Sequence, residues 1–159
     1  MTLRRIGRLL TGRYPLAVDL GLLLLRLFIG CGIAAHGAQK LGLIGGGGIS
    51  QFVGFLESLH VPHPLLMAYL AAGSEFLGGL ALAAGFLTRL SWIPPTIAMA
   101  VAIITVHLHH GYFAQGGGFE YPLNLAAVFV GLGIIGAGRF SCDGLLGRWL
   151  ERGSAGTEP

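Results

Sequence analysis

Charged residues are scarce in this chain of 159 residues: they make up 11% of it, whereas hydrophobic residues make up 53%. A soluble domain usually carries about 25% charged residues, and a soluble helical bundle needs polar outer faces that repeat at the helical period. This shortage excludes an ordinary water-soluble surface and predicts a membrane protein. The length allows one domain.

Other features are missing as well. The only cysteines, Cys31 and Cys142, are expected on opposite halves of the membrane, which argues against a disulfide between them. The sequence has no Cys-x-x-Cys-His motif for haem attachment. It also has no phosphate-binding glycine loop with a lysine, no dinucleotide fingerprint and no nucleophile elbow. Basic residues do not cluster with aromatic ones, so nucleic acid is not a predicted partner.

Four apolar stretches approach the length that crosses a bilayer as a helix, which is about 20 residues. They cover residues 16–36, 65–87, 91–110 and 122–138. Prolines lie close to the start of each stretch, where a helix tolerates a missing N–H. We therefore predict an all-α fold, an integral membrane four-helix bundle.

The basic residues predict the orientation of this bundle. Eight of the ten fall on one side of it: Arg4, Arg5, Arg8, Arg13, Arg89, Arg139, Arg148 and Arg152. Because basic segments stay in the cytoplasm, both termini are expected there, with the chain in the cell (inner) membrane. Residues 1–15 then form a cytoplasmic segment and residues 16–146 the membrane domain. Residues 147–159 form a cytoplasmic tail, expected to be disordered at its end.

The first outer loop contains a run of four glycines followed by residues 49–59, whose apolar residues recur at helical spacing. This second piece predicts an amphipathic helix too short to span the membrane. We expect it to lie in the interface or to fold back over the bundle.

Two charged residues lie within the predicted spans. Arg26 is near the middle of the first span and Glu75 near the middle of the second. A charge inside a bilayer needs a partner or a function, and antiparallel spans put the two residues at a similar depth. We therefore expect an ion pair between them. Whether it only locks the helices or also serves a proton or ligand site stays open.

A second polar group gathers at the outer ends of spans one, three and four. Its members are His36, Gln39, Lys40, His107, His109, His110, Glu120 and Asn124. Turned inward they would form a polar vestibule, and turned outward they would meet headgroups and water. His107 and His110 are spaced to share a helix face, but a third ligand would have to come from elsewhere, so neither a metal site nor a haem is predicted.

Taken in order along the chain, these motifs resemble the DoxX family of small prokaryotic membrane proteins. The resemblance covers residues 16–146. It is carried by an arginine in span one followed by residues 36–41, then by Glu75, Gly85, Thr88 and Arg89, by His107, and by residues 116–121 and 136–143. Cys142 departs from the pattern, which has an aliphatic residue there. The family takes its name from a subunit of a thiosulfate:quinone oxidoreductase of sulfur-oxidising archaea, and some members are linked to redox complexes that handle oxidative stress and thiols.

The resemblance implies a membrane subunit of an oxidoreductase system that interacts with quinone or with a redox partner protein. A quinone needs an apolar slot, hydrogen-bond donors and titratable groups. We assign candidate catalytic roles to Glu75, Arg26 and His107, and candidate ligand-binding roles to His36, Gln39, Lys40, His107 and Asn124. Predicted partners are the lipid bilayer, quinone, other redox subunits and a second copy of the chain. A non-catalytic scaffold for redox enzymes is the alternative, followed by transport of a small solute or protons.

Overall fold

The computed structural model describes residues 15–154, and within that range the chain forms helices and loops but no strand. The predicted all-α fold is therefore confirmed. Residues 1–14 and 155–159, which hold most of the predicted N-terminal segment and the end of the predicted tail, lie outside the described residues.

The apolar helices follow the predicted spans closely. The first is α2 (Pro15–Leu41) and the second is α4 (Pro64–Ala84). The third is composite: α5 (Thr88–Ser91), α6 (Ile93–Ala102), the π-helical η1 (Ile103–His107) and the 3-10 turn η2 (Leu108–His110) follow one another. The fourth is α7 (Glu120–Ile135).

Three of these helical segments, residues 15–41, 64–84 and 88–110, are long and apolar enough to cross a membrane. The fourth, α7, is also apolar, but its 16 residues span only about 24 Å. A bilayer's hydrocarbon core is about 30 Å thick. The prediction of four spans therefore holds by length for three helices, and the fourth is shorter than a typical span.

Helices α2 and α4 pack against each other through small residues. A side chain at Gly30 would lie 2.6 Å from the backbone nitrogen of Ala83, and one at Gly79 would lie 2.6 Å from that of Ala34. Because the backbones approach this closely, only glycine fits at these two positions. This contact fixes the register of the antiparallel pair, with Gly30 level with Gly79 and Ala83.

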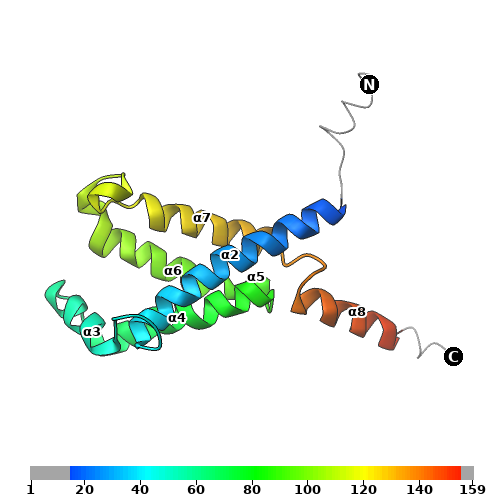
Figure 1. The fold of residues 1–159 in the computed structure, drawn as a ribbon, viewed down its shortest axis with the longest axis horizontal. Helices are drawn as coiled ribbons and strands as arrows, with labels where there is room; N and C mark the ends of the chain where they lie inside the picture. Colours follow the sequence, from blue (N-terminus) through cyan, green and yellow to red (C-terminus); the bar gives the residue numbers. More distant parts are fainter. Residues whose placement is uncertain (1–14, 155–159) are drawn as a thin grey trace, which may run out of the picture.

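Helices α6 and α7 complete the bundle on one side of this pair (Figure 1). Helix α6 packs between α4 and α7, with Pro95 against Gly78, and Trp92 lies over Gly133 of α7. The buried apolar centre consists of Ile33, Leu82, Met99, Leu125 and Phe129. Many large apolar side chains on α2, α4 and α6 are exposed instead. These outward-facing side chains are suited to contact with lipid rather than water.

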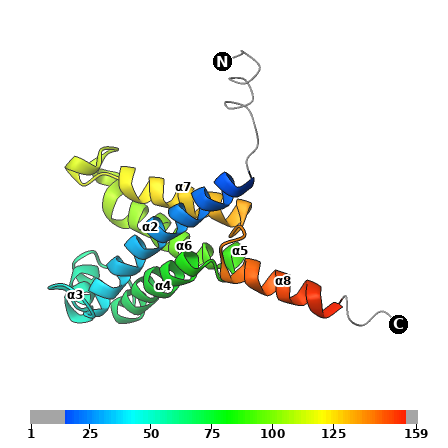
Figure 2. The same cartoon turned by 45° about the vertical axis from the view of Figure 1, so that its right-hand side comes forward.

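The two ends of the bundle differ, as Figure 2 shows. One end, here called the α3 end, carries α3 (Ile49–Ser58) and the loop of residues 111–119 with its short turn η3 (Ala114–Gly116). Helix α3 confirms the predicted short amphipathic helix, and it packs on α4 and α2 through the buried Leu56. The opposite end, here called the α8 end, carries α5, the loop of residues 136–141 and α8.

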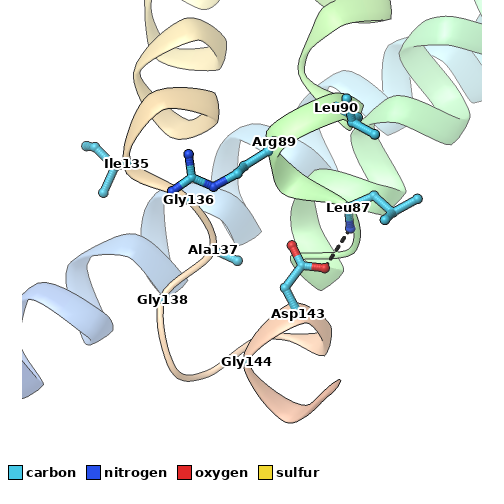
Figure 3. A pocket seen from close by; sticks show the side chains of 9 residues that line it. All are labelled: Leu87, Arg89, Leu90, Ile135, Gly136, Ala137, Gly138, Asp143 and Gly144. Atoms are coloured by element: carbon cyan, nitrogen blue, oxygen red, sulfur yellow. Dashed lines mark hydrogen bonds between the residues drawn. The ribbon is translucent and has the colours of Figure 1, made fainter. Parts of the chain in front are cut away.

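Helix α8 (Cys142–Ser154) was not predicted as an element, and it overlaps the start of the predicted tail. It extends away from the bundle (Figures 1 and 2). Its first turn is anchored by Asp143, whose Oδ1 accepts a hydrogen bond from the Leu87 N–H at 2.8 Å (Figure 3). The Oδ2 of Asp143 accepts a second one from the Thr88 N–H at 2.9 Å. The side chain of Asp143 therefore caps α5 and joins α8 to the α4–α5 turn.

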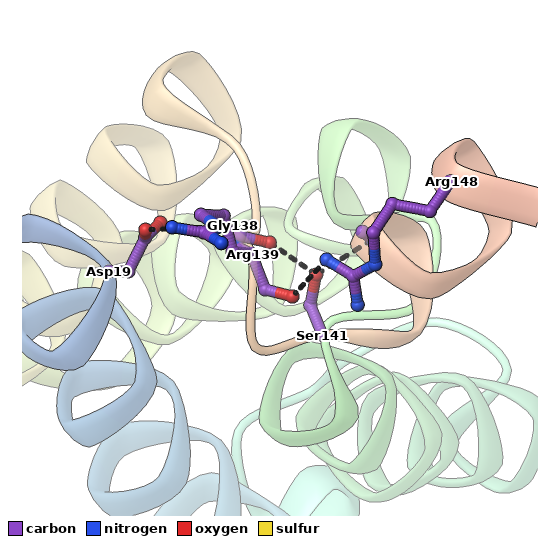
Figure 4. Close-up of polar contacts among 6 residues, drawn as sticks. Asp19, Gly138, Arg139, Ser141 and Arg148 are labelled. Atoms are coloured by element: carbon purple, nitrogen blue, oxygen red, sulfur yellow. Dashed lines mark hydrogen bonds and ion pairs between the residues drawn. The ribbon is translucent and has the colours of Figure 1, made fainter. Parts of the chain in front are cut away.

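The loop of residues 136–141 is held by polar contacts with α2, with α8 and within the loop itself (Figure 4). Asp19 of α2 accepts a hydrogen bond from the backbone N–H of Arg139 at 2.9 Å. The Ser141 hydroxyl donates to the carbonyl of Gly138 at 2.5 Å, and Arg148 of α8 donates to the carbonyl of Arg139 at 3.2 Å. These contacts hold the chain between α7 and α8 against the end of α2.

Candidate functional site

A buried ion pair marks the candidate site. The ammonium group of Lys40 lies 2.6 Å from both carboxylate oxygens of Glu75. The side chain of Glu75 is only 4% exposed and that of Lys40 is 29% exposed. The predicted pair between Arg26 and Glu75 is therefore wrong, because Lys40 is the partner of Glu75.

The register of α2 and α4 explains this correction. Helix α2 continues to Leu41, past the predicted end of the span at His36, so Lys40 still belongs to it. The close contact at Gly37, which lies against the backbones of Ala72 and Phe76, sets residues 36–40 beside the part of α4 that carries Glu75.

Arg26 lies near the α8 end instead. It is completely buried, and its guanidinium donates a hydrogen bond to the carbonyl oxygen of Phe140. Its Nη1 is packed against Gly85, where no side chain would fit. Arg26 therefore holds the loop of residues 136–141 against α2 and α4, and it does not line the cavity around Glu75.

The Lys40–Glu75 pair lies in the wall of a cavity of about 190 Å³, here called the Glu75 cavity. Helices α2, α4, α6 and α7 and the segment η1 contribute to it. Its lining residues are Ile33, His36, Lys40, Glu75, Met99, Ala102, His107, Tyr121, Pro122 and Leu125. Four residues singled out in the sequence, His36, Lys40, Glu75 and His107, are thus brought together around one space.

His107 reaches this cavity through a local irregularity of the third span. Residues 103–107 form a π-helical turn, in which the N–H of Leu108 bonds to the carbonyl of Ile103, five residues back. Such turns inside helices are frequent at functional sites. The Nδ1 of His107 lies 2.6 Å from the carbonyl oxygen of Gly117, so the imidazole is held between the third span and the loop of residues 111–119.

That loop is itself well braced. The backbone N–H groups of Phe119 and Glu120 bond to the carbonyls of Gly111 and Tyr112 at 3.1 and 2.8 Å, and the carboxylate of Glu120 accepts the N–H of Ala114 at 3.0 Å. These hydrogen bonds give the loop of residues 111–119 a defined conformation at the α3 end.

The rims of the cavity are formed by more exposed groups. His36 is exposed and lies edge-on to the ring of Tyr121, with 6.3 Å between ring centroids. On the side of α3, the ring of Phe52 lies 4.9 Å from the ammonium nitrogen of Lys40, in a cation–π contact. The amphipathic helix α3 thus covers the lysine of the buried pair.

Two predicted ligand-binding residues do not line the cavity. Gln39 is exposed, and its side chain lies beside the glycine loop at Gly45 and Gly47. Asn124 is exposed on α7. His110 is also turned elsewhere, with its Nδ1 2.9 Å from the carbonyl of Val106. No group of three or more histidine, cysteine, aspartate or glutamate side chains suited to a metal ion occurs within the described residues.

Sequence reasoning missed the apolar half of the cavity, formed by Ile33, Met99, Ala102, Pro122 and Leu125. Nothing in the sequence separates these residues from the rest of a uniformly apolar span. The ring of Tyr121, which sequence reasoning did not select, also stands at the cavity. The arrangement offers an ammonium donor, a carboxylate and two imidazoles around an apolar space, which suits a flat ligand with polar edges.

Comparisons with known proteins show the family to which the chain belongs. The family model described as DoxX matches residues 21–108, the part of the chain that contains Arg26, Lys40, Glu75 and His107. An uncharacterized protein of Haemophilus influenzae is 30% identical over 129 residues, which is 79% of this chain and 82% of the relative. No solved structure gives a significant match.

Two further relatives carry more informative names. A Bacillus subtilis protein named "Putative oxidoreductase CatD" is 32% identical over 72% of this chain and 79% of its own length. The inner membrane protein YqjF of Escherichia coli is 31% identical over 82% of this chain and 95% of its own length. With apolar helices of membrane-spanning length and a family match over more than half of its residues, the chain is a membrane protein of the DoxX family.

Proposed function

We propose that the Glu75 cavity binds the ring of a quinone, and that the chain is the quinone-interacting membrane subunit of an oxidoreductase. The observation that carries this proposal is the ion pair between the buried Glu75 and the partly buried Lys40, which lies with His36 and His107 in the wall of a cavity between apolar helices. A charged pair inside a membrane domain costs free energy and is commonly retained for a function.

The size and polarity of the cavity suit a single ring. Its volume of about 190 Å³ compares with roughly 150 Å³ for an engineered cavity that binds benzene. An ammonium group has three N–H donors, and Glu75 takes two of those on Lys40, which leaves one for a carbonyl oxygen of the ligand.

The titratable groups fit the proton requirement of quinone chemistry. Reduction of a quinone to a hydroquinone consumes two electrons and two protons. We assign the transfer of these protons to the imidazoles of His36 and His107 and the carboxylate of Glu75, which surround the cavity. The electrons come from a redox partner protein. The name of the Bacillus subtilis relative describes that protein as an oxidoreductase, which supports this class of activity.

The first test is mass spectrometry of organic extracts from the detergent-purified protein, scaled to protein amount. Wild type should carry near-stoichiometric quinone. Glu75→Gln should be depleted, because the substitution leaves Lys40 without its counter-ion and disturbs the donor that faces the ligand. We expect the disturbed Lys40 to lose its hydrogen bond to the quinone. A hydrogen bond that involves a charged group contributes about 1.5–3 kcal/mol, so quinone affinity should fall about tenfold or more.

Glu57→Gln provides the matched control, since it makes the same chemical change at an exposed position of α3. It should retain quinone at the wild-type level. A second variant with His36→Ala and His107→Ala tests the imidazoles, and unchanged quinone affinity in that folded protein would show that they have no part in the site.

A scaffold for redox enzymes is the second candidate, and α8 favours it. The large apolar residues Leu145, Leu146, Trp149 and Leu150 are all exposed on this helix, which extends from the bundle. Quinone at background level in both wild type and Glu75→Gln would favour this role. The next measurement would then be whether a redox enzyme co-purifies with the full chain and is lost when these residues are made polar.

A further inference from the structure

A second cavity of the described chain lies at the α8 end, at the opposite end of the bundle from the Glu75 cavity. It has a volume of about 460 Å³ and is here called the Arg89 cavity. It is framed by α5, the end of α7, the loop that follows α7, and the first turn of α8 (Figure 3). Its lining residues are Leu87, Arg89, Leu90, Ile135, Gly136, Ala137, Gly138, Asp143 and Gly144.

Arg89 is the one cationic side chain that lines this cavity. It extends from α5 across to Gly136 at the end of α7, and its Nη2 lies 3.9 Å from the position of a Cβ on that glycine. Within the described part of the chain, no hydrogen bond or ion pair engages its guanidinium group. Five N–H donors are therefore available at the cavity.

The other polar groups of the cavity are compatible with an anion. Both oxygens of Asp143 already accept backbone N–H groups, those of Leu87 and Thr88. The backbone N–H groups of Ala137 and Gly138, which line the cavity, have no hydrogen-bond acceptor among residues 15–154. The guanidinium of Arg89 and these two N–H groups are therefore donors that an anion in the cavity can use.

The apolar residues around the cavity indicate the chemical class of the anionic ligand. Leu87, Leu90 and Ile135 are 50%, 60% and 61% exposed, so large apolar side chains flank the guanidinium at the end of the bundle. Trp92, whose indole N–H donates to the carbonyl of Arg89 at 3.0 Å, is typical of the membrane–water boundary. A ligand that fits both features carries a phosphate beside hydrocarbon chains.

We propose that the Arg89 cavity binds the headgroup of an anionic phospholipid, with the phosphate on Arg89 and the acyl chains along Leu87, Leu90 and Ile135. Basic pockets between membrane helices on the cytoplasmic side are known to recognise anionic headgroups. Arg89 also has a simpler role open to it, because a cation near the C-terminus of α7 is favourable for that helix. The experiment must therefore read lipid binding and not only stability.

The test uses the full-length protein, purified in detergent and depleted of lipid. Its unfolding midpoint is followed while phosphatidylglycerol, phosphatidylcholine or inorganic phosphate is added. Wild type should be stabilised most by phosphatidylglycerol. In Arg89→Gln the apparent affinity for phosphatidylglycerol should be about fivefold weaker, the loss expected for one basic residue at a membrane surface.

Arg152→Gln is the charge-matched control, since it removes one positive charge at an exposed position of α8 outside the cavity. It should respond to phosphatidylglycerol as wild type does. Arg89→Lys keeps the charge without the planar guanidinium and should bind with intermediate affinity, which preserves the test if Arg89→Gln does not fold.

Two results would overturn the proposal. Equal responses to phosphatidylglycerol in wild type and in the folded Arg89 variants would mean that Arg89 does not bind the lipid. Its role would then be limited to stabilising the C-terminus of α7. Stabilisation of wild type by inorganic phosphate that matches the stabilisation by phosphatidylglycerol would assign the cavity to a free anion instead of a lipid.

Discussion

At the scale of single residues, the feature that matters most is the contact between Lys40 and Glu75. Lys40→Met leaves the carboxylate of Glu75 buried without a partner, and breaking a buried pair in this way costs about 3 kcal/mol. We expect a correspondingly lower free energy of unfolding, measured in detergent by tryptophan fluorescence. The double variant Lys40→Met with Glu75→Leu should recover most of the loss, because no unpaired charge remains. A single variant as stable as wild type would contradict the pairing.

The sequence identified the residue types of the site correctly but not their pairing. Glu75 stands out as a charge inside a span, and His36, Lys40 and His107 stand out as polar groups at the outer ends of the spans; all four line one cavity. Which cation meets Glu75 depends on how far α2 continues and on where its glycines touch α4. Those contacts are tertiary, so counting positions from the middle of each span gave Arg26 instead.

At the scale of elements, the close contact of α2 and α4 is the most sensitive part of the fold. In Gly79→Ala the added Cβ would lie 2.6 Å from the backbone nitrogen of Ala34 and 2.7 Å from the carbonyl oxygen of Gly30. Since neither atom can move alone, the helices must separate. We expect a loss of about 1–3 kcal/mol in the free energy of unfolding.

Gly73→Ala is the control on the same helix, because a Cβ there would meet no atom within 4 Å. It should be neutral or slightly stabilising, as alanine favours a helix by up to about 1 kcal/mol over glycine. Equal effects of the two substitutions would mean that the helix contact is not limited by space at Gly79.

The elements also show where sequence reasoning succeeds and fails. Long apolar runs predicted the main helices, and the spacing of residues 49–59 predicted α3. The apolar residues Leu145, Leu146, Trp149 and Leu150 lie on α8, and the predicted boundary after residue 146 divides them between the membrane domain and the tail. The π-helical turn at residues 103–107 has no sequence signature, and neither has the contact of His107 with the carbonyl oxygen of Gly117 in the loop that follows.

At the scale of the whole molecule, the predicted orientation can be tested through the cysteines. Cys142 is exposed at the start of α8, and a cytoplasmic α8 end predicts that it is shielded in intact cells. In a Cys31→Ala background, a membrane-impermeant maleimide should label Cys142 in inverted vesicles but not in intact cells. Ser58→Cys, placed on exposed α3 in a chain without other cysteines, should give the reverse pattern. Labelling of Cys142 in intact cells would place the α8 end outside.

The π-helical turn also determines how the third span tolerates changes in length. One residue of an α-helix corresponds to a rotation of about 100°, so a one-residue deletion within residues 103–106 can be absorbed by converting the turn to regular α-helix. Hydropathy and span length would hardly change, and His107 would keep its place at the Glu75 cavity because the turn gives up its extra residue. Relatives with one residue fewer here should therefore be aligned with a gap inside residues 103–106, which keeps their cavity-facing side chain in the same column as His107.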